Sequence, residues 1–151
     1  MTKQLITESY LTCHYDETVP VVAHRWSGYV KSEAFRSGIQ QCLAEYAKIK
    51  QSAKLTHLHW LCNATDLKVL QPADSDWVNN EFARELYQNG VRRIAMIVPK
   101  DVFAKMATTS FGKSVDKQQQ QGGITDTIVQ YFDSEEKAKQ WLKQAVEVVY
   151  P

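Results

Sequence analysis

Two histidines, His57 and His59, are the residues whose types and spacing most directly suggest chemistry. Residues two apart on a β-strand point to the same face, so this pair would place two imidazoles side by side, as a metal site requires. A metal site also needs a third and a fourth ligand. No nearby carboxylate pattern supplies them, and Cys62 points to the opposite face. The pattern therefore favours two packed strand histidines, and we predict no metal site.

Nucleophilic catalysis would require a cysteine or serine beside a base and an orienting group. Cys13, Cys42 and Cys62 are widely spaced, and none lies at an expected helix N-terminus, where its pKa would fall. There is no Gly-x-Ser-x-Gly elbow, and the Gly122-Gly123 pair lacks the Lys-Ser/Thr of a phosphate-binding loop. We therefore predict no catalytic residue and no cofactor, and we interpret the cysteines as small core side chains.

The tryptophans suggest binding rather than catalysis. Of the four, Trp26 and Trp77 fall at or beyond the ends of expected strands, whereas the other two suit core positions. With Asn63 and Asp66 as polar anchors, they would combine aromatic walls with a few polar groups, as small-molecule sites do. The alternative is that both tryptophans simply cover the end of a sheet.

The elements that position these residues follow from hydrophobic periodicity. A central strand is expected from Leu55, running out into a polar loop before Pro72. The other predicted strands cover residues 5–15, 19–26, 93–98 and 127–132, and the predicted helices begin with capping residues at Ser32, at Asp74 or Ser75, at Asp101 and at Asp133. The glutamine-rich segment 112–123 is interpreted as an exposed, mobile loop.

The resulting order of elements is ββαβαβαβα. The first two strands are so close in sequence that they can pair only antiparallel, and each later strand–helix–strand unit should make a right-handed crossover. We therefore predict one α/β domain over residues 1–151, with a mostly parallel five-stranded sheet, an N-terminal antiparallel hairpin and four helices. Ligands bind such sheets beyond the carboxyl ends of the strands, so a site is expected between Asn63 and Trp77.

Composition narrows the classes of partner. The net charge of +1 provides no overall field to attract nucleic acid, and Arg92-Arg93, the tightest basic pair, is interpreted as a solvated strand end. Apolar runs are far shorter than the ~20 residues that a membrane helix needs, and the N-terminus does not resemble a secretory signal. We expect a cytoplasmic protein with no nucleic-acid partner and no membrane span.

The order of elements resembles the anti-sigma-factor-antagonist (STAS) fold and the related SpoIIAA-like proteins. Three stretches carry the resemblance: Trp-Ser-Gly at 26–28, Gly-x-x-x-Ile-Ala-x-Ile-Val-Pro at 90–99, and Phe-Asp-Ser-x-x-x-Ala-x-x-Trp-Leu at 132–142. In signalling members of that family, a kinase phosphorylates the serine of an Asp-Ser motif. The resemblance places Asp74 and Ser75 there, but Asp76 and Trp77 replace the small residues that follow, which favours an ordinary helix cap.

The resemblance and the lack of a catalytic constellation together predict a non-enzymatic regulatory or protein-binding module. The alternative is a carrier of a small apolar molecule or lipid, with a pocket at the carboxyl edge of the sheet. The candidate binding residues in either case are Trp26, Asn63, Asp66, Ser75 and Trp77. A third hypothesis is a structural homodimer, formed through the edge of the first strand or an exposed helix face.

Overall fold

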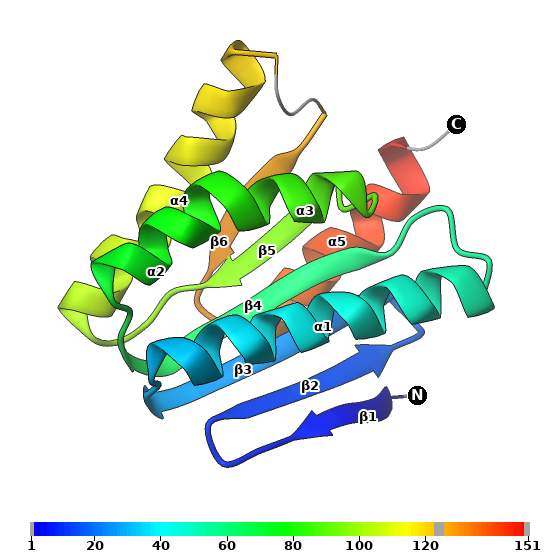
Figure 1. Cartoon of the computed structure of the whole chain (residues 1–151). Helices are drawn as coiled ribbons and strands as arrows, with labels where there is room; N and C mark the ends of the chain where they lie inside the picture. Colours follow the sequence, from blue (N-terminus) through cyan, green and yellow to red (C-terminus); the bar gives the residue numbers. More distant parts are fainter. Residues whose placement is uncertain (1, 123–125, 150–151) are drawn as a thin grey trace.

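The computed structural model describes residues 2–122 and 126–149, in which six strands form one mixed sheet (Figure 1). The strands lie side by side in chain order: β1 (Thr2–Thr7), β2 (Leu11–Asp16), β3 (Val21–Tyr29), β4 (His59–Val69), β5 (Arg93–Ile97) and β6 (Ile128–Phe132). The first three strands pair antiparallel, because turns of a few residues join them. From β3 to β6 the pairing is parallel, and a helical segment joins each pair. The predicted α/β class is confirmed.

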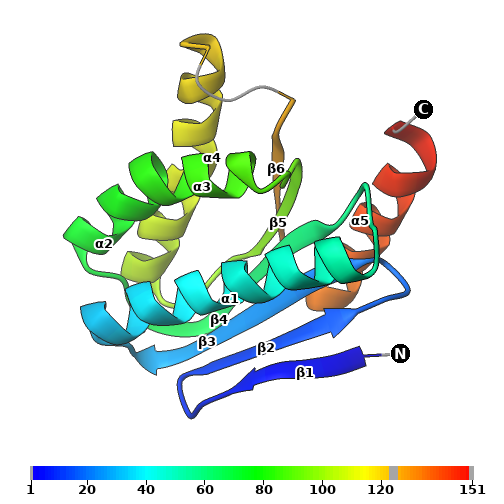
Figure 2. The same cartoon turned by 45° about the vertical axis from the view of Figure 1, so that its right-hand side comes forward.

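Helices cover both faces of this sheet (Figures 1 and 2). One face carries α1 (Ser32–Ser52), α4 (Val102–Gln120), and a continuous helical segment made of α2 (Pro72–Trp77), the π-helical turn η1 (Val78–Phe82) and α3 (Ala83–Gln88). These connections all step in the same direction across the sheet, so a constant right-handed crossover places them on one face. The C-terminal helix α5 (Glu135–Val149) covers the other face.

Strand β4 is buried on both faces, as expected for the middle of a parallel sheet. On the side of α1, Trp60 and Ala64 belong to the larger core cluster, together with aromatic side chains of β3, α1 and η1. On the side of α5, Leu61 packs in a second cluster with Leu142. The strand predicted to be central therefore lies between β3 and β5, in the middle of the parallel part of the sheet.

Close packing of α1 on the sheet depends on Gly38. A Cβ atom at this position would lie 2.8 Å from Leu11 Cδ2 and 3.0 Å from Trp26 Cη2, and both of those side chains are 1% exposed. Such distances are too short for carbon atoms in contact, and the buried neighbours have little space to move. A glycine therefore allows the helix to lie directly over Trp26.

The expected strand over residues 5–15 is wrong in its extent, because it is a hairpin of β1 and β2. The chain turns at residues 8–10, where the backbone N–H of Glu8 donates to the carbonyl of Leu11 at 2.8 Å. The sheet consequently has six strands rather than five. The central strand also begins later than expected, at His59 rather than Leu55, and continues to Val69 through part of the expected polar loop, so that it includes Asp66 as well as Asn63.

The glutamine-rich segment is likewise not a loop, because α4 continues to Gln120. Phe111, Val115 and Gln118 form its buried face, at helical spacing. Met106, predicted to point inward, is 67% exposed because it lies on the opposite side of the helix from that face. The other predicted inward residues of this helix, 102, 103 and 107, lie outside the residues whose side chains the structure describes, and so does Gly123.

Three of the four predicted helix caps are shifted, whereas α4 begins at Val102, directly after the predicted cap Asp101. Helix α1 begins after Lys31 and α2 after Gln71, and neither capping residue makes a side-chain cap bond. Ser32, Asp74 and Ser75 instead lie inside the first turns. At α5, the hydroxyl of Ser134 accepts the Lys137 backbone N–H at 3.3 Å, which gives Ser134 the role expected for Asp133. Across the described residues, no helix combines the length and apolar character that crossing a membrane requires.

An ion pair ties the N-terminal hairpin to α5. Asp16, at the end of β2, accepts hydrogen bonds from Lys139 Nζ at 3.0 Å and from the backbone N–H and hydroxyl of Thr18 at 3.0 and 2.7 Å. Burial alone would raise the pKa of Asp16, but these hydrogen bonds and the charge of Lys139 lower it to about 2.

We expect Asp16→Asn to lower the free energy of unfolding by about 2 kcal/mol at neutral pH. The pKa of Asp16 is about 2 in the folded chain and 3.8 when unperturbed, so its contribution exists above about pH 4 and disappears as the pH falls through about 2. Urea unfolding at neutral pH and at about pH 3 should therefore show a smaller difference between the wild type and the variant in acid.

Asp133→Asn is the matched control. Asp133 also pairs with a lysine, Lys137, at 3.1 Å, but both side chains are mostly exposed, at 72% and 65%. We expect this control to change stability by less than about 0.5 kcal/mol. A pH-independent effect of Asp16→Asn would contradict the assigned role of the Asp16 carboxylate.

Candidate functional site

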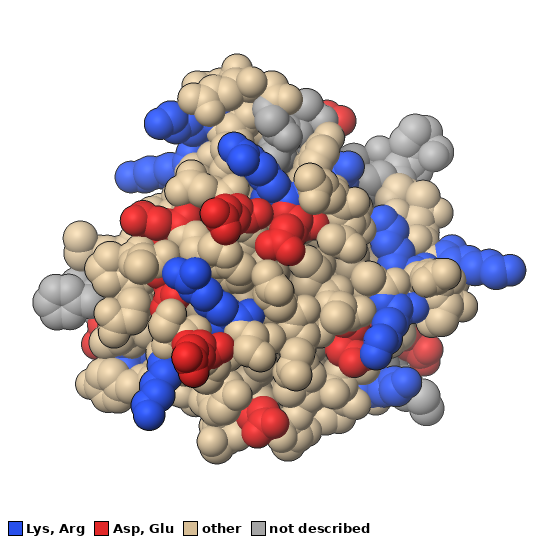
Figure 3. Space-filling model, viewed as in Figure 1, with Lys and Arg blue, Asp and Glu red and all other residues tan. Residues whose placement is uncertain are grey.

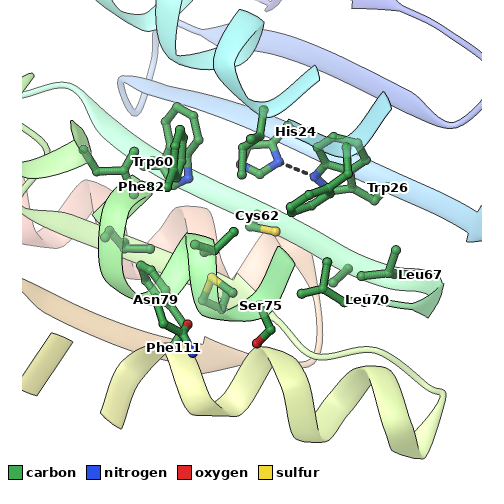
Figure 4. A pocket seen from close by; sticks show the side chains of 17 residues that line it. His24, Trp26, Trp60, Cys62, Leu67, Leu70, Ser75, Asn79, Phe82 and Phe111 are labelled. Atoms are coloured by element: carbon green, nitrogen blue, oxygen red, sulfur yellow. Dashed lines mark hydrogen bonds between the residues drawn. The ribbon is translucent and has the colours of Figure 1, made fainter. Parts of the chain in front are cut away.

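A small hollow lies between the sheet and the helices that cover its α1 face (Figure 4). Its volume is about 50 Å³. Its walls are mostly aromatic and apolar, and include Trp26, Phe35, Trp60, Phe82, Met96 and Phe111. Polar groups are few, and His24, Ser75 and Asn79 are among them. An apolar enclosure with a few polar groups is the usual composition of a small-molecule site.

His24 supplies a buried donor in this hollow. Its Nδ1 accepts a hydrogen bond from Trp26 Nε1 at 2.8 Å, so the neutral ring must carry its proton on Nε2. Burial lowers the pKa of His24 to about 3, which keeps the ring neutral at physiological pH. Nε2 is buried and has no hydrogen-bond partner among the described residues. It is therefore an unsatisfied N–H group facing apolar side chains.

The π-helical turn η1 forms part of the wall, with Val78, Asn79 and Phe82. The backbone carbonyl of Asn79 accepts hydrogen bonds from two side chains of α4, Ser114 at 2.8 Å and Gln118 at 2.6 Å. These bonds satisfy a carbonyl in the widened turn and hold α4 against η1. They also explain why the glutamine-rich segment is helical rather than a loop.

The sheet separates the predicted binding residues into two sets. Trp26 and Ser75 line the hollow, and Trp77 lies on the same side but outside it, with its ring 5.3 Å from that of Phe82. Asn63 is on the opposite face, where its Oδ1 accepts hydrogen bonds from the backbone and hydroxyl of Thr65. The predicted pocket that combined Trp26, Trp77, Asn63 and Asp66 is thus not formed as one cavity.

Asp66 also lies on the Asn63 side of the sheet, where it pairs with Arg25. The hydrogen bond from Arg25 lowers the pKa of Asp66. Both side chains are substantially exposed. This pair is therefore a feature of the outer surface rather than a polar anchor for the apolar hollow.

Residues at the starts of α1 and α2 form a second feature at the carboxyl edge of the parallel strands. Asp74, 1% exposed, accepts hydrogen bonds on Oδ1 from Ser32 Oγ at 2.6 Å and Arg36 Nε at 2.7 Å. The Arg36 guanidinium also lies 5.1 Å from the centre of the Trp77 ring, a cation–π distance. Tyr29, at the end of β3, is 80% exposed. This edge thus carries an exposed tyrosine and a guanidinium stacked on a tryptophan.

Burial shifts the pKa values of the residues that were considered for catalysis away from physiological pH. Burial, with the charges of Arg93 and His57, lowers the pKa of His59 to about 4, and burial raises the pKa of Cys62 to about 12. A general acid or base works best with a pKa near the working pH, and these groups are far from it. His57 precedes β4 rather than lying in it. Within residues 2–122 and 126–149, no three His, Cys, Asp or Glu side chains group as metal ligands.

Sequence reasoning singled out none of Tyr29, Arg36 and His24 as a site residue. No spacing in the chain connects Arg36 with Asp74, because 38 residues separate them. The exposure of Tyr29 also has no local signal, since β-strand tyrosines are frequently buried. A local hint was the predicted end of the strand over residues 19–26, although β3 in fact continues to Tyr29.

We expect Arg36→Met to lower the free energy of unfolding by about 2 kcal/mol, because it leaves the buried Asp74 carboxylate without its cation. The arginine side chain is 40% exposed, so the effect should be smaller than for a fully buried pair. Urea denaturation of Arg36→Met, Asp74→Asn and the double variant measures the change in the free energy of unfolding that each causes. The double variant should be more stable than the sum of the single effects predicts.

Arg84→Met is the control, since Arg84 is an exposed arginine on α3. It should change stability by less than about 0.5 kcal/mol. Strict additivity in the Arg36 and Asp74 cycle would show that the two side chains do not stabilise each other.

Comparisons with known proteins agree with this architecture. A family model described as SpoIIAA-like matches residues 21–143, from the first residue of β3 into α5. Comparisons with curated proteins and with solved structures gave no match. The matched region contains the four parallel strands and the helices that connect them, which is the STAS-like arrangement expected from the sequence. Because the match extends over most of its 151 residues, the chain belongs to the SpoIIAA-like family.

Proposed function

We propose that this chain is a non-enzymatic regulatory module that binds a protein partner through the carboxyl edge of its parallel strands. Membership of the SpoIIAA-like family supports a regulatory role based on protein interaction. The observation that carries the proposal is the surface at this edge formed by the exposed Tyr29 and by Arg36, 40% exposed, which lies over the half-buried Trp77.

These residue types suit a protein interface. Tyrosine, tryptophan and arginine are enriched among the residues that supply most of the binding energy in protein complexes. Arg36 is already held by Asp74 and Trp77, so little conformational entropy would be lost when a partner binds it. Figures 1 and 2 show that the end of β3 and the starts of α1 and α2 lie at the same end of the molecule. The three side chains can thus belong to one continuous contact surface.

Charge provides a further argument about the partner. Figure 3 shows acidic and basic side chains interspersed over the α1 and α2–α3 face, so this face has no uniform field of one sign. Nucleic-acid surfaces are usually marked by a basic patch or stripe. This face therefore lacks the mark of a nucleic-acid surface, which is consistent with a protein partner.

Ser75 has a structural role in this proposal. It is 9% exposed, lines the apolar hollow, and follows the buried Asp74. A kinase acting on its hydroxyl would have to displace α2 from the core. We therefore assign recognition to the exposed residues at the carboxyl edge and do not require phosphorylation of Ser75.

Site-specific photo-cross-linking in cells tests the proposed surface. A photoreactive residue in place of Tyr29 should capture a partner protein, whereas the same residue in place of Gln51 should not, because Gln51 is exposed at the far end of α1. Introducing Arg36→Glu should abolish the capture, provided that circular dichroism shows the variant folded beside the buried Asp74, and the identified partner should bind the purified chain with at least about tenfold lower affinity after that change. Equal capture from both positions, or capture unaffected by Arg36→Glu, would contradict the proposed interface.

A carrier function remains the second candidate, and the unsatisfied Nε2–H of His24 specifically favours it. A ligand with one hydrogen-bond acceptor and an otherwise apolar surface would satisfy this donor inside the hollow. The volume of about 50 Å³ is well below the roughly 300–1,000 Å³ of typical ligand pockets. The occupant would therefore be small, or a larger one would require α2–α3 to move away from the sheet.

Native mass spectrometry of protein purified from cells tests the carrier function. A retained ligand should add a defined mass, and His24→Leu should remove it by eliminating the donor. His59→Leu is the matched control, because His59 is equally buried but does not line the hollow. A clean apo mass, with no change in tryptophan fluorescence on adding small alcohols or short fatty acids, would contradict this function.

Self-association through the β1 edge stays a prediction. The β1–β2 ladder is interrupted between Gln4 and Ile6, and such bulges hinder edge-to-edge pairing with another strand. The irregular β1 edge thus gives little support to a homodimer. The carboxyl edge gives more support to binding of a different protein.

A further inference from the structure

The amino edge of the parallel strands, at the opposite end of the molecule from the proposed interface, contains a separate hollow of about 220 Å³. Three segments far apart in the chain meet there: the end of α1, the segment leading into β4, and the turn between α3 and β5. Figures 1 and 2 both show these segments at one end of the molecule. The lining residues are Lys50, Thr56, His57, Leu58, Gly90 and Arg92.

Two of these residues, Lys50 and Arg92, are cations held in place by neutral backbone groups. Lys50 Nζ donates to the carbonyl of Asn89 at 3.2 Å. Arg92 donates to the carbonyls of Tyr87 and Val91, each at 2.9 Å, and its guanidinium lies 3.8 Å from the centre of the Tyr87 ring. Neither cation forms an ion pair with a carboxylate in the part of the chain that the structure describes. Their positions are fixed, and the charge that faces them is the partial negative charge of carbonyls at the C-terminus of α3 rather than a carboxylate.

The positive charges in this hollow act on one another. Burial lowers the pKa of Lys50, and the charge of Arg92 lowers it further. Burial also lowers the pKa of His57, with contributions from Lys50 and Arg93. Asp116 and Asp126 line a neighbouring hollow together with Arg92 and Arg93, but no carboxylate is among the groups that shift Lys50 or His57. Like charges held this close are unfavourable unless an anion joins them.

Gly90 makes this arrangement possible. Its φ is +92°, and a Cβ atom built on it would lie 1.8 Å from Lys50 Nζ. Any other residue would therefore exclude the ammonium group from its position over the turn. The left-handed backbone and the missing side chain together leave room for Lys50 beside Arg92.

We propose that this hollow binds the phosphate group of a small phosphomonoester. The two positive charges of Lys50 and Arg92 would balance the two negative charges of a phosphate dianion. An arginine guanidinium can donate two parallel hydrogen bonds to phosphate oxygens, and the Thr56 hydroxyl lies among the lining groups. The volume exceeds the need of a bare phosphate ion, which leaves space for a small organic group. This site is independent of the proposed protein interface, because it lies at the other end of the strands and shares no residue with it.

Nuclear magnetic resonance titration of the 151-residue chain tests the site. Inorganic phosphate and glycerol 3-phosphate are added separately at constant ionic strength, with chloride as the reference anion, and the His57 ring signals report on the hollow. We expect saturable shifts for both phosphates and an increase in the pKa of His57, since a nearby anion favours the protonated ring. Tighter binding of glycerol 3-phosphate would identify an organic phosphate as the ligand, and equal binding would identify the free ion.

Lys50→Gln and Arg92→Gln should each weaken phosphate binding by at least about tenfold, which corresponds to ~1.4 kcal/mol. Lys48→Gln is the matched control, because Lys48 lies on the same helix but is 74% exposed and pairs with Glu45. The phosphate affinity of Lys48→Gln should equal that of the wild type. Circular dichroism checks that each variant is folded. Absence of saturation below about 10 mM in the wild type, or an equal loss in the Lys48 control, would overturn the proposal.

Discussion

Burial of both faces of β4 is the constraint on which the rest of this structure depends. A parallel strand between two parallel neighbours has no solvated face, so Trp60 and Ala64 require a cover on one side and Leu61 requires one on the other. Three crossovers of the same hand place their helices on the Trp60 side. Helix α5 must then return to cover the Leu61 side, and the Lys139–Asp16 pair joins it to the hairpin.

The same burial decides where function can lie. His24 and His59 are buried and Cys62 is partly buried, which keeps the histidines neutral and the thiol protonated at physiological pH. On the α1 face, the interior is therefore a layer of packed rings around the small hollow. Groups capable of recognition lie instead at the two ends of the parallel strands, with aromatic and guanidinium groups at the carboxyl edge and paired cations at the amino edge.

Much of the architecture could be predicted because it depends on local periodicity. Helix α1, strand β5 and the final strand and helix appear close to their expected positions, since their apolar spacing is strong. Predictions failed where a tertiary contact outweighed a local signal. The hydrogen bonds from Ser114 and Gln118 to Asn79 extend α4 through a segment that composition suggested to be a loop. The caps predicted for α1 and α2 failed because Ser32 and Asp74 bond to each other across the two helices.

By itself, the sequence determined the α/β class, the parallel order of the later strands and the central place of β4, because periodicity and chain connectivity leave few alternatives. Only the tertiary structure decided which side chains share a site. The alternation of side chains along a strand places Asn63 on the opposite face of the sheet from Trp26, although both were candidates for one pocket. Conversely, folding brings Lys50 to within contact of Gly90, 40 positions away, and places it beside Arg92. Such contacts depend on helix crossings and strand register, which no short stretch of sequence encodes.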